Sequence, residues 1–255
     1  MSYVSDVWYL LVRHLRAQLR MPVFIFVSIV QPMFWLVLFS QLFRSLADLP
    51  GFPTGSYLQF FAPGVLVMLV LFGSTYSGMS MIRDMDLGVI TKMLATPATR
   101  VSIVLSRVLS TIVVLIVQCS IILIVAWVMG VSIATGIPGA LLMIVFLGLF
   151  GLGFAGLSNC LAILFKKPEP LMGVLTFLTL PLMFLSSAMM PSTLLPTWID
   201  AAKKFNPVQY AIEPIRSLVT TGYDWPTLLI NMAILTAFAA LTVGFASAMF
   251  RIKGE

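Results

Sequence analysis

Charged residues divide this chain into long apolar stretches. A Lys, Arg or Asp at the centre of a membrane-spanning helix costs roughly 2.5–3.5 kcal/mol on insertion scales, so the windows between charges locate candidate spans. Five such windows are present, at residues 21–43, 49–82, 108–165, 170–199 and 225–250. The third window has room for two spans of about 20 residues, and Gly and Pro interrupt it in the stretch GVSIATGIPG, residues 130–139. The pattern therefore predicts six membrane-spanning helices.

The composition agrees with a membrane protein. Hydrophobic residues make up 60% of the chain and charged residues only 9%, whereas average soluble domains contain about 25% charged residues. The mean hydropathy is +1.06. We expect an all-α membrane protein whose residues 1–255 form one transmembrane domain. The predicted spans are residues 22–43, 58–82, 103–129, 139–165, 170–190 and 226–250.

The basic residues predict the orientation in the membrane. An even number of spans places both termini on one side, and Lys and Arg are enriched on the cytoplasmic side. With cytoplasmic termini, eleven basic residues lie in inner segments and four lie outside, namely Arg44, Lys203, Lys204 and Arg216. We therefore expect a multi-pass protein of the cell (cytoplasmic) membrane with both termini in the cytoplasm. The net charge of +6 suits contact with anionic membrane lipid, and no nucleic-acid partner is expected.

Residues 1–21 predict an amphipathic helix that lies at the membrane surface. Three arginines occupy one face, Arg13, Arg16 and Arg20. Apolar residues recur at helical spacing on another face, at Val4, Trp8, Leu11, Leu15 and Leu19. This arrangement is typical of interfacial helices. His14 is the only histidine of the chain, and we interpret it as an interfacial polar residue.

Residues 191–224, between the last two predicted spans, contain two apolar stretches that are too short to cross a membrane. Asn206 followed by Pro207 is typical of a helix N-cap and first helical position, and Gly222 is typical of a helix end. Non-helical backbone inside a bilayer must be packed against protein or face a water-filled cavity. We expect two short helices that form a re-entrant hairpin in the outer leaflet, packed against the bundle.

Several classes of membrane enzyme and carrier are disfavoured. No acidic residue lies near the middle of a predicted span, whereas intramembrane proteases and ion-coupled carriers need ionisable groups there. Cys119 and Cys160 fall within predicted spans and form neither a disulfide framework nor a metal-ligand pattern, so no metal is expected. The sequence has no GxxxxGK[ST] phosphate-binding loop. We expect a transport subunit rather than an enzyme, with any ATP-driven motor in a separate subunit.

The longest polar stretch between two spans is RDMDLGVITKMLATPATR, residues 83–100. Asp84 and Asp86 suit the first turn of a short helix, because the helix dipole favours acids there. Pro97 predicts that this helix ends near Thr96. A single apolar stripe follows the helical period, formed by Leu87, Ile90 and Leu94. The stripe predicts a helix that lies on lipid, packs under its own bundle or fills a groove in a partner.

At this point the chain resembles the permease subunits of the type-two ABC exporters, and most strongly the daunorubicin-resistance-like permeases. The first matching motif has acids, a Gly, an apolar pair, Thr-Pro and a basic residue, here Asp84, Asp86, Gly88, Leu94, Ala95, Thr96, Pro97 and Arg100. The second motif has Asn-Pro, an aromatic residue and Arg, here Asn206, Pro207, Tyr210 and Arg216. With the predicted spans and the N-terminal helix, the resemblance covers nearly the whole chain.

The resemblance implies two functional regions. The loop at residues 83–100 would be a coupling helix that docks in a groove of the ATPase subunit, with contacts from Arg83, Asp84, Asp86, Leu87, Gly88, Ile90, Leu94, Thr96, Pro97 and Arg100. The re-entrant helices would lie at the external mouth, with a candidate outer gate of Phe205, Asn206, Pro207, Tyr210, Glu213 and Arg216. Glu213 and Arg216 are three residues apart, and we expect them to pair, either as a solvated surface pair or as part of the gate.

Four uncharged polar residues lie inside the predicted spans, namely Gln31, Gln118, Asn159 and Asn231. Such residues either form hydrogen bonds between helices or line a substrate path, and the sequence leaves both open.

Our leading hypothesis is the transmembrane subunit of an ATP-driven ABC exporter that moves an amphipathic drug-like or lipid-like compound out of the cell. It would pair with a second copy of this chain or a homologous permease and with two ATPase subunits, which use ATP and Mg²⁺. The alternatives are a permease of the same family that exports a cell-surface glycan, and a motor-independent channel or scaffold.

Overall fold

The computed structural model describes residues 3–48, 52–96, 99–191 and 195–253, and these segments are helical without strands. The helices are α1 (Tyr3–Leu19), α2 (Pro22–Leu42), η1 (Arg44–Asp48), α3 (Tyr57–Asp86), α4 (Val89–Leu94), α5 (Arg100–Val128), α6 (Gly136–Phe165), α7 (Pro168–Phe184), α8 (Thr197–Ala202), η3 (Lys203–Phe205), α9 (Pro207–Thr220) and α10 (Trp225–Lys253). The expected all-α fold is confirmed.

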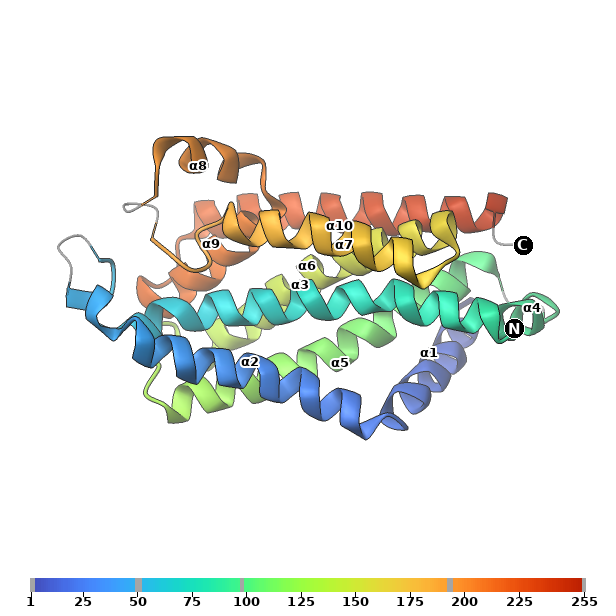
Figure 1. The fold of residues 1–255 in the computed structure, drawn as a ribbon, viewed down its shortest axis with the longest axis horizontal. Coiled ribbons are helices and arrows are strands. Elements are labelled where there is room, and N and C mark those ends of the chain that lie inside the picture. Colours follow the sequence, from blue (N-terminus) through green and yellow to red (C-terminus); the bar gives the residue numbers. More distant parts are fainter. Residues whose placement is uncertain (1–2, 49–51, 97–98, 192–194, 254–255) are drawn as a thin grey trace.

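The long helices run side by side along the long axis of the molecule (Figure 1). α3 and α6 lie at the centre, and α10 and α5 pack against them. Most of α3 is buried, whereas few residues of α2 are. We call one end of the bundle the α4 end, because α4 lies there with the start of α1 and the end of α10 (Figure 1). The opposite end, with α8 and α9, is the α9 end.

Five helices of the described residues are long and apolar enough to cross a membrane, namely α2, α3, α5, α6 and α10. The expected span at residues 170–190 corresponds to α7, which has 17 residues and ends at Phe184. At 1.5 Å per residue, such a helix is about 25 Å long and falls short of a hydrocarbon core of about 30 Å. The helical part of this span is therefore shorter than predicted.

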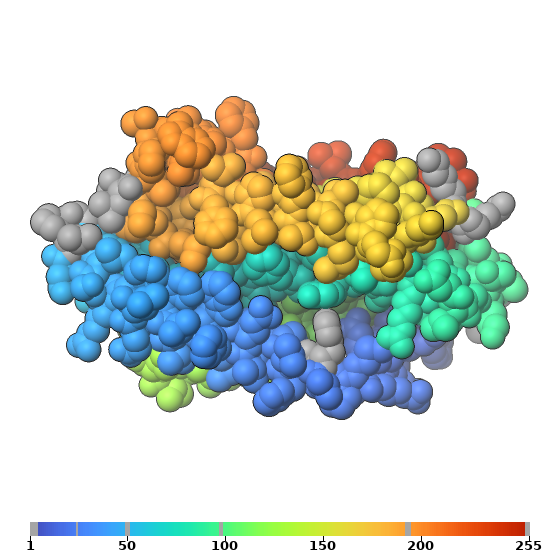
Figure 2. Space-filling view, viewed as in Figure 1, coloured from blue at the N-terminus to red at the C-terminus, as the bar shows by residue number. Residues whose placement is uncertain are grey.

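The expected hairpin at residues 191–224 contains two short helices, α8 and α9, as predicted. The side chain of Asn206 accepts a hydrogen bond from the backbone N–H of Val208 at 2.9 Å, and Pro207 is the first helical residue of α9. Gly222 follows α9 with a φ of 110°, which suits glycine. One face of α9 is buried against α3, α6 and α10, whereas α8 stands out from the body at the α9 end (Figure 2).

Two hydrophobic clusters stabilise the bundle. The larger cluster surrounds α3, α6 and α9. The smaller one lies at the α4 end and includes Met81, Ile82, Ile103 and Phe250. Ile90 and Met93 of α4 belong to this smaller cluster, so α4 is anchored to the bundle by its own apolar side chains.

Candidate functional site

The stretch at residues 83–100 begins as a continuation of α3. Asp84 and Asp86 lie in the last turn of α3, not in the first turn of a new helix, so this part of the prediction is wrong. The helix break is two residues after Asp86, at Gly88, whose φ of 64° is the left-handed conformation that glycine adopts at helix ends. The N–H of Gly88 donates to the carbonyl of Met85 at 2.9 Å. The backbone conformation of Gly88, rather than the charge pattern, determines where α4 starts.

The three residues of the predicted apolar stripe do not share one exposed face. Ile90 is 4% exposed and packs into the bundle, and Leu94 is half-buried against the same cluster. Leu87 is 63% exposed. Since Leu87 precedes the Gly88 bend, it does not follow the helical period of α4. The single stripe is therefore wrong, and Leu87 alone of the three presents its side chain to the surroundings.

The remaining residues of this stretch lie around the bend. Arg83, Asp86, Thr91, Lys92 and Thr96 are exposed. The hydroxyl of Thr96 donates to the carbonyl of Met93 at 2.6 Å, and Arg100 donates to the carbonyl of Arg251 at 3.1 Å. Pro97 lies outside the described residues.

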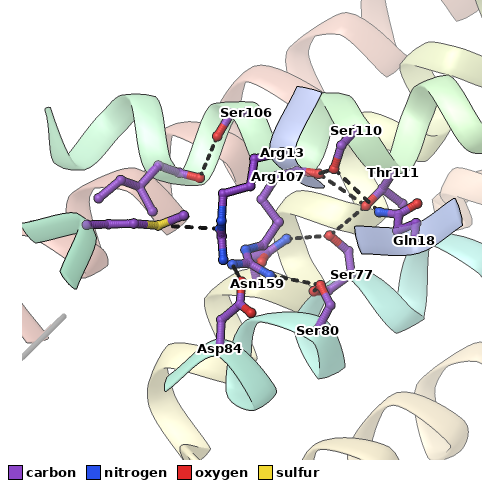
Figure 3. A network of polar contacts seen from close by, with 12 residues as sticks. Arg13, Gln18, Ser77, Ser80, Asp84, Ser106, Arg107, Ser110, Thr111 and Asn159 are labelled. Atoms are coloured by element: carbon purple, nitrogen blue, oxygen red, sulfur yellow. Dashed lines mark hydrogen bonds and ion pairs between the residues drawn. The ribbon is translucent and has the colours of Figure 1, made fainter. Parts of the chain in front are cut away.

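A buried ion pair joins α5 to the last turn of α3, just before α4. Arg107 of α5 is 2% exposed, and its guanidinium donates to the carboxylate of Asp84 at 2.5 Å and to the hydroxyl of Ser80 at 2.9 Å (Figure 3). A charged group without water must be paired to remain charged. Arg107 and Asp84 therefore hold together the two helices that flank α4. This pair also explains why Asp84 is tolerated at the unfavourable end of the α3 dipole.

From the sequence alone, Arg107 is one of the eleven basic residues assigned to the inner side. Its position within an apolar helix was a signal, because an Arg there needs a partner. Asp84 and Asp86, in the polar stretch before α5, were the acidic residues nearest to Arg107 in the sequence.

The polar contacts continue into the bundle. The hydroxyl of Ser77 accepts hydrogen bonds from the hydroxyl of Thr111 at 3.1 Å and from the amide of Asn159 at 2.8 Å, so it joins α3, α5 and α6 (Figure 3). Nearby, Gly78 lets α3 approach α6, because a Cβ at this position would lie 2.4 Å from the carbonyl oxygen of Ser158. The three central helices thus form one connected unit next to the ion pair.

The N-terminal helix α1 packs along α5, the helix that carries Arg107. Gln18 donates to the hydroxyl of Ser110 at 3.5 Å. His14 is 5% exposed, so its interpretation as an interfacial polar residue is wrong. Its Nε2 atom has no hydrogen-bond partner among the described residues. Burial, and then the positive charges of Arg107 and Arg13, lower the pKa of His14 from 6.5 to about 2. His14 is therefore neutral while α1 is docked, and its protonation would oppose docking. We call this meeting point of α1, α3, α4 and α5 the α4 junction.

The candidate path residues have separate surroundings. Gln118 donates to the hydroxyl of Ser28 at 2.7 Å and joins α5 to α2, and Asn159 joins α6 to α3. Gln31 is exposed on α2, and Asn231 is buried on α10. A groove of about 620 Å³ runs along α7, and one of about 230 Å³ lies between α6 and α10. Neither groove is lined by any of these four residues. For Gln118 and Asn159, the hydrogen bond between helices is the role that the structure shows.

The candidate gate residues lie at the α9 end. Phe205 is 89% exposed, and the hydroxyl of Tyr210 donates to the carbonyl of Lys204. The expected pair of Glu213 with Arg216 is not formed. Arg216 instead donates to the carbonyl and hydroxyl of Ser187, at 2.6 and 3.0 Å, while Glu213 is exposed. Arg216 faces the bundle, where backbone carbonyls need donors, and this direction leads away from Glu213.

No group of three His, Cys, Asp or Glu side chains that could hold a metal ion is found within the described part of the chain. Cys119 and Cys160 are free and buried.

Comparison with known proteins identifies the family of this chain. A transport permease of Cyanophora paradoxa, ycf38, is 34% identical over 215 residues, which are 82% of this chain and 73% of that protein. The daunorubicin resistance ABC transporter permease DrrB1 of Streptomyces coeruleorubidus is 26% identical over 237 residues, 91% of this chain and 82% of that protein. The multidrug ABC transporter permease YbhR of Escherichia coli K12 is 23% identical over 203 residues, 79% of this chain and 54% of that protein. The family description "ABC-2 type transporter" matches residues 5–220. With that match over most of its length, the chain belongs to the ABC-2 type transporter family.

Proposed function

We propose that this chain is the transmembrane subunit of an ATP-driven exporter, and that a separate ATPase subunit docks at α4. The substrate would be an amphipathic drug-like or lipid-like compound that leaves the cell. Family membership supports a transport subunit. The names of DrrB1, a daunorubicin resistance permease, and YbhR, a multidrug permease, support this class of substrate.

The observation that carries the proposal is the exposed Leu87 at the tip of a firmly anchored bend. An isolated exposed Leu is common on protein surfaces. Here, however, it lies at the bend between α3 and α4. α4 is held by Ile90 and Met93, and the last turn of α3 is braced by the ion pair of Asp84 and Arg107. A rigid projection with one apolar tip suits a partner groove, and it can transmit a push to α3 and α5. Leu87 and the exposed Asp86, Thr91 and Lys92 would form the docking surface.

The assembly would contain two ATPase subunits, which use ATP and Mg²⁺, and a second copy of this chain or a homologous permease. The α4 end would face the cytoplasm in the cell (cytoplasmic) membrane. Most Lys and Arg residues lie in the segments assigned to the inner side, and the positive-inside rule therefore supports this orientation. The start of α1 and the end of α10 lie at this same end, as an even number of crossings requires (Figure 1). The α9 end would then be the external mouth, and α7 would complete a sixth crossing.

Co-purification with the ATPase tests the proposal. The chain would be expressed with an ATPase encoded beside it, and Leu87→Asp would be compared with Trp198→Asp. The two side chains are 63% and 64% exposed, and they lie at opposite ends of the bundle. Burying a Leu side chain contributes about 1.5–3 kcal/mol, so we expect Leu87→Asp to weaken ATPase association by about tenfold or more. Trp198→Asp should leave association unchanged.

Two results would count against the proposal. Full ATPase association of the Leu87→Asp variant would remove α4 as the docking site. Repeated failure of any ATPase to co-purify with the native chain would favour a motor-independent channel or scaffold.

A further inference from the structure

The segment that follows α7 is buried although it is not helical. α7 ends at Phe184, yet Ser186, Ser187 and Ala188 are 3%, 1% and 0% exposed. Backbone N–H and C=O groups that are buried without partners cost free energy comparable to a lost hydrogen bond. Residues 185–190 must therefore obtain from neighbouring side chains the partners that a continued helix would supply.

Two side chains of α9 provide partners for Ser187. The side-chain oxygen of Gln209 accepts hydrogen bonds from the N–H and the hydroxyl of Ser187, both at 3.0 Å. Arg216 donates to the carbonyl of Ser187 at 2.6 Å and to its hydroxyl at 3.0 Å. Both backbone polar groups of Ser187 are thus satisfied by α9.

The N-cap residue of α9 caps two helices at once. The amide of Asn206 donates to the carbonyl of Leu182 at 2.6 Å and to that of Leu185 at 2.9 Å, at the end of α7. The side-chain oxygen of the same residue accepts from the N–H of Val208 and begins α9. Asn206 therefore fixes the end of α7 to the start of α9.

α3 holds the segment from the other side. The hydroxyl of Tyr57 donates to the carbonyl of Met189 at 3.1 Å. A Cβ on Gly64 would lie 2.4 Å from the carbonyl oxygen of Ala188, so only glycine permits this approach. The guanidinium carbon of Arg216 lies 3.9 Å from the centre of the Phe60 ring, in a cation–π contact.

We infer that residues 185–190 complete the membrane crossing begun by α7 as unwound chain, and that Asn206, Gln209 and Arg216 lock this segment, α9 and the adjoining end of α3 into one rigid block. Non-helical backbone at membrane depth persists only where protein supplies its partners. Separating α9 from the segment would leave several of these groups unpaired at once. Any opening at the α9 end therefore leaves the block intact, and Asn206 and Arg216 act as anchors rather than as moving gate residues. Only this last consequence, for the transport cycle, rests on the proposed function.

Amide hydrogen exchange of the purified chain, followed by mass spectrometry, tests the block. In the native protein, residues 185–190 should exchange much more slowly than the loop at residues 221–224, which is mostly exposed. Arg216→Met and Gln209→Ala should each speed exchange in 185–190 by roughly tenfold, since each removes partners of a buried backbone group. Glu213→Gln, on the exposed face of the same helix, should leave it unchanged. Arg216→Lys keeps one donor and should give an intermediate rate even if Arg216→Met fails to accumulate.

Two outcomes would overturn the inference without any transport assay. Exchange of 185–190 as fast as that of 221–224 in the native protein would show that the segment is not held. Unchanged slow exchange in Gln209→Ala and in the Arg216 variants would show that immersion in detergent or lipid, rather than α9, protects it.

A further measurement, in the complex with the ATPase during ATP hydrolysis, tests the rigidity. Protection of 185–190 and of α9 should change together or not at all, and loss in 185–190 alone would contradict one block. If no ATPase binds, the proposed function fails, while the comparison of native protein and variants still decides whether the block exists.

Discussion

Exchanging Asp84 for Asn keeps the shape of the side chain and removes the negative charge that faces Arg107. Because Arg107 is 2% exposed, water cannot replace this charge. Removing one member of a fully buried pair costs about 3–5 kcal/mol. The Asp84 side chain is 19% exposed, so partial solvent screening should reduce the loss to about 2–3 kcal/mol.

A double-mutant cycle isolates the pair from other effects of the substitutions. The free energy of unfolding would be measured in mixed detergent for Asp84→Asn, Arg107→Met and the double variant. We expect the double variant to lose less than the sum of the single losses, with a coupling of about 0.5–3 kcal/mol. Asp86→Asn, at an exposed position in the same turn, should change stability by less than about 0.5 kcal/mol. Additive losses would refute the reasoning that this pair braces α3 against α5.

Two further predictions concern packing at the same end of the bundle. Undocked α1 exposes His14 with a pKa near 6.5, whereas docked His14 has a pKa of about 2, so protonation favours undocking. Docking should be strongest above pH 6.5 and weaken by about 1.4 kcal/mol as the pH falls from 7.5 to 5.5. Proteolysis or amide exchange of α1 measures this change, and His14→Gln should remove the pH dependence. Gly78→Ala forces α3 away from the backbone of Ser158 and should lower the free energy of unfolding by about 1–3 kcal/mol. Gly244→Ala should be tolerated, because nothing lies within 4 Å of a Cβ there. Equal stability of the two variants would contradict the close contact of α3 with Ser158.

Local and compositional signals predicted much of the fold. Apolar windows located the five long helices within a few residues, because a charge inside the bilayer is costly wherever the chain goes. The start of α9 was also predictable, since the side chain of Asn206 caps its own neighbouring backbone. These features depend on residues close together in the sequence.

Features that depend on distant residues were missed or misassigned. The helix period predicted that Leu87 and Ile90 share a face, but the backbone turns at Gly88 between them. Arg216 was paired with Glu213 by sequence spacing, whereas its partner Ser187 is 29 residues away. The end of α7 at Phe184 depends on partners supplied by α9 and α3. A pattern along one helix cannot show which neighbour will offer such partners.

The central claim is that an ATPase subunit docks at the bend that carries Leu87. The most direct measurement is crosslinking from single cysteines at Asp86 or Thr91, in a chain whose Cys119 and Cys160 have been replaced by Ala. Both positions are exposed beside the bend, and Ser56→Cys, exposed at the α9 end, is the matched control. The account predicts a crosslinked product of this chain and the ATPase from Asp86→Cys or Thr91→Cys, and none from Ser56→Cys. Co-purification of the ATPase without any crosslink from the two α4 positions would contradict it.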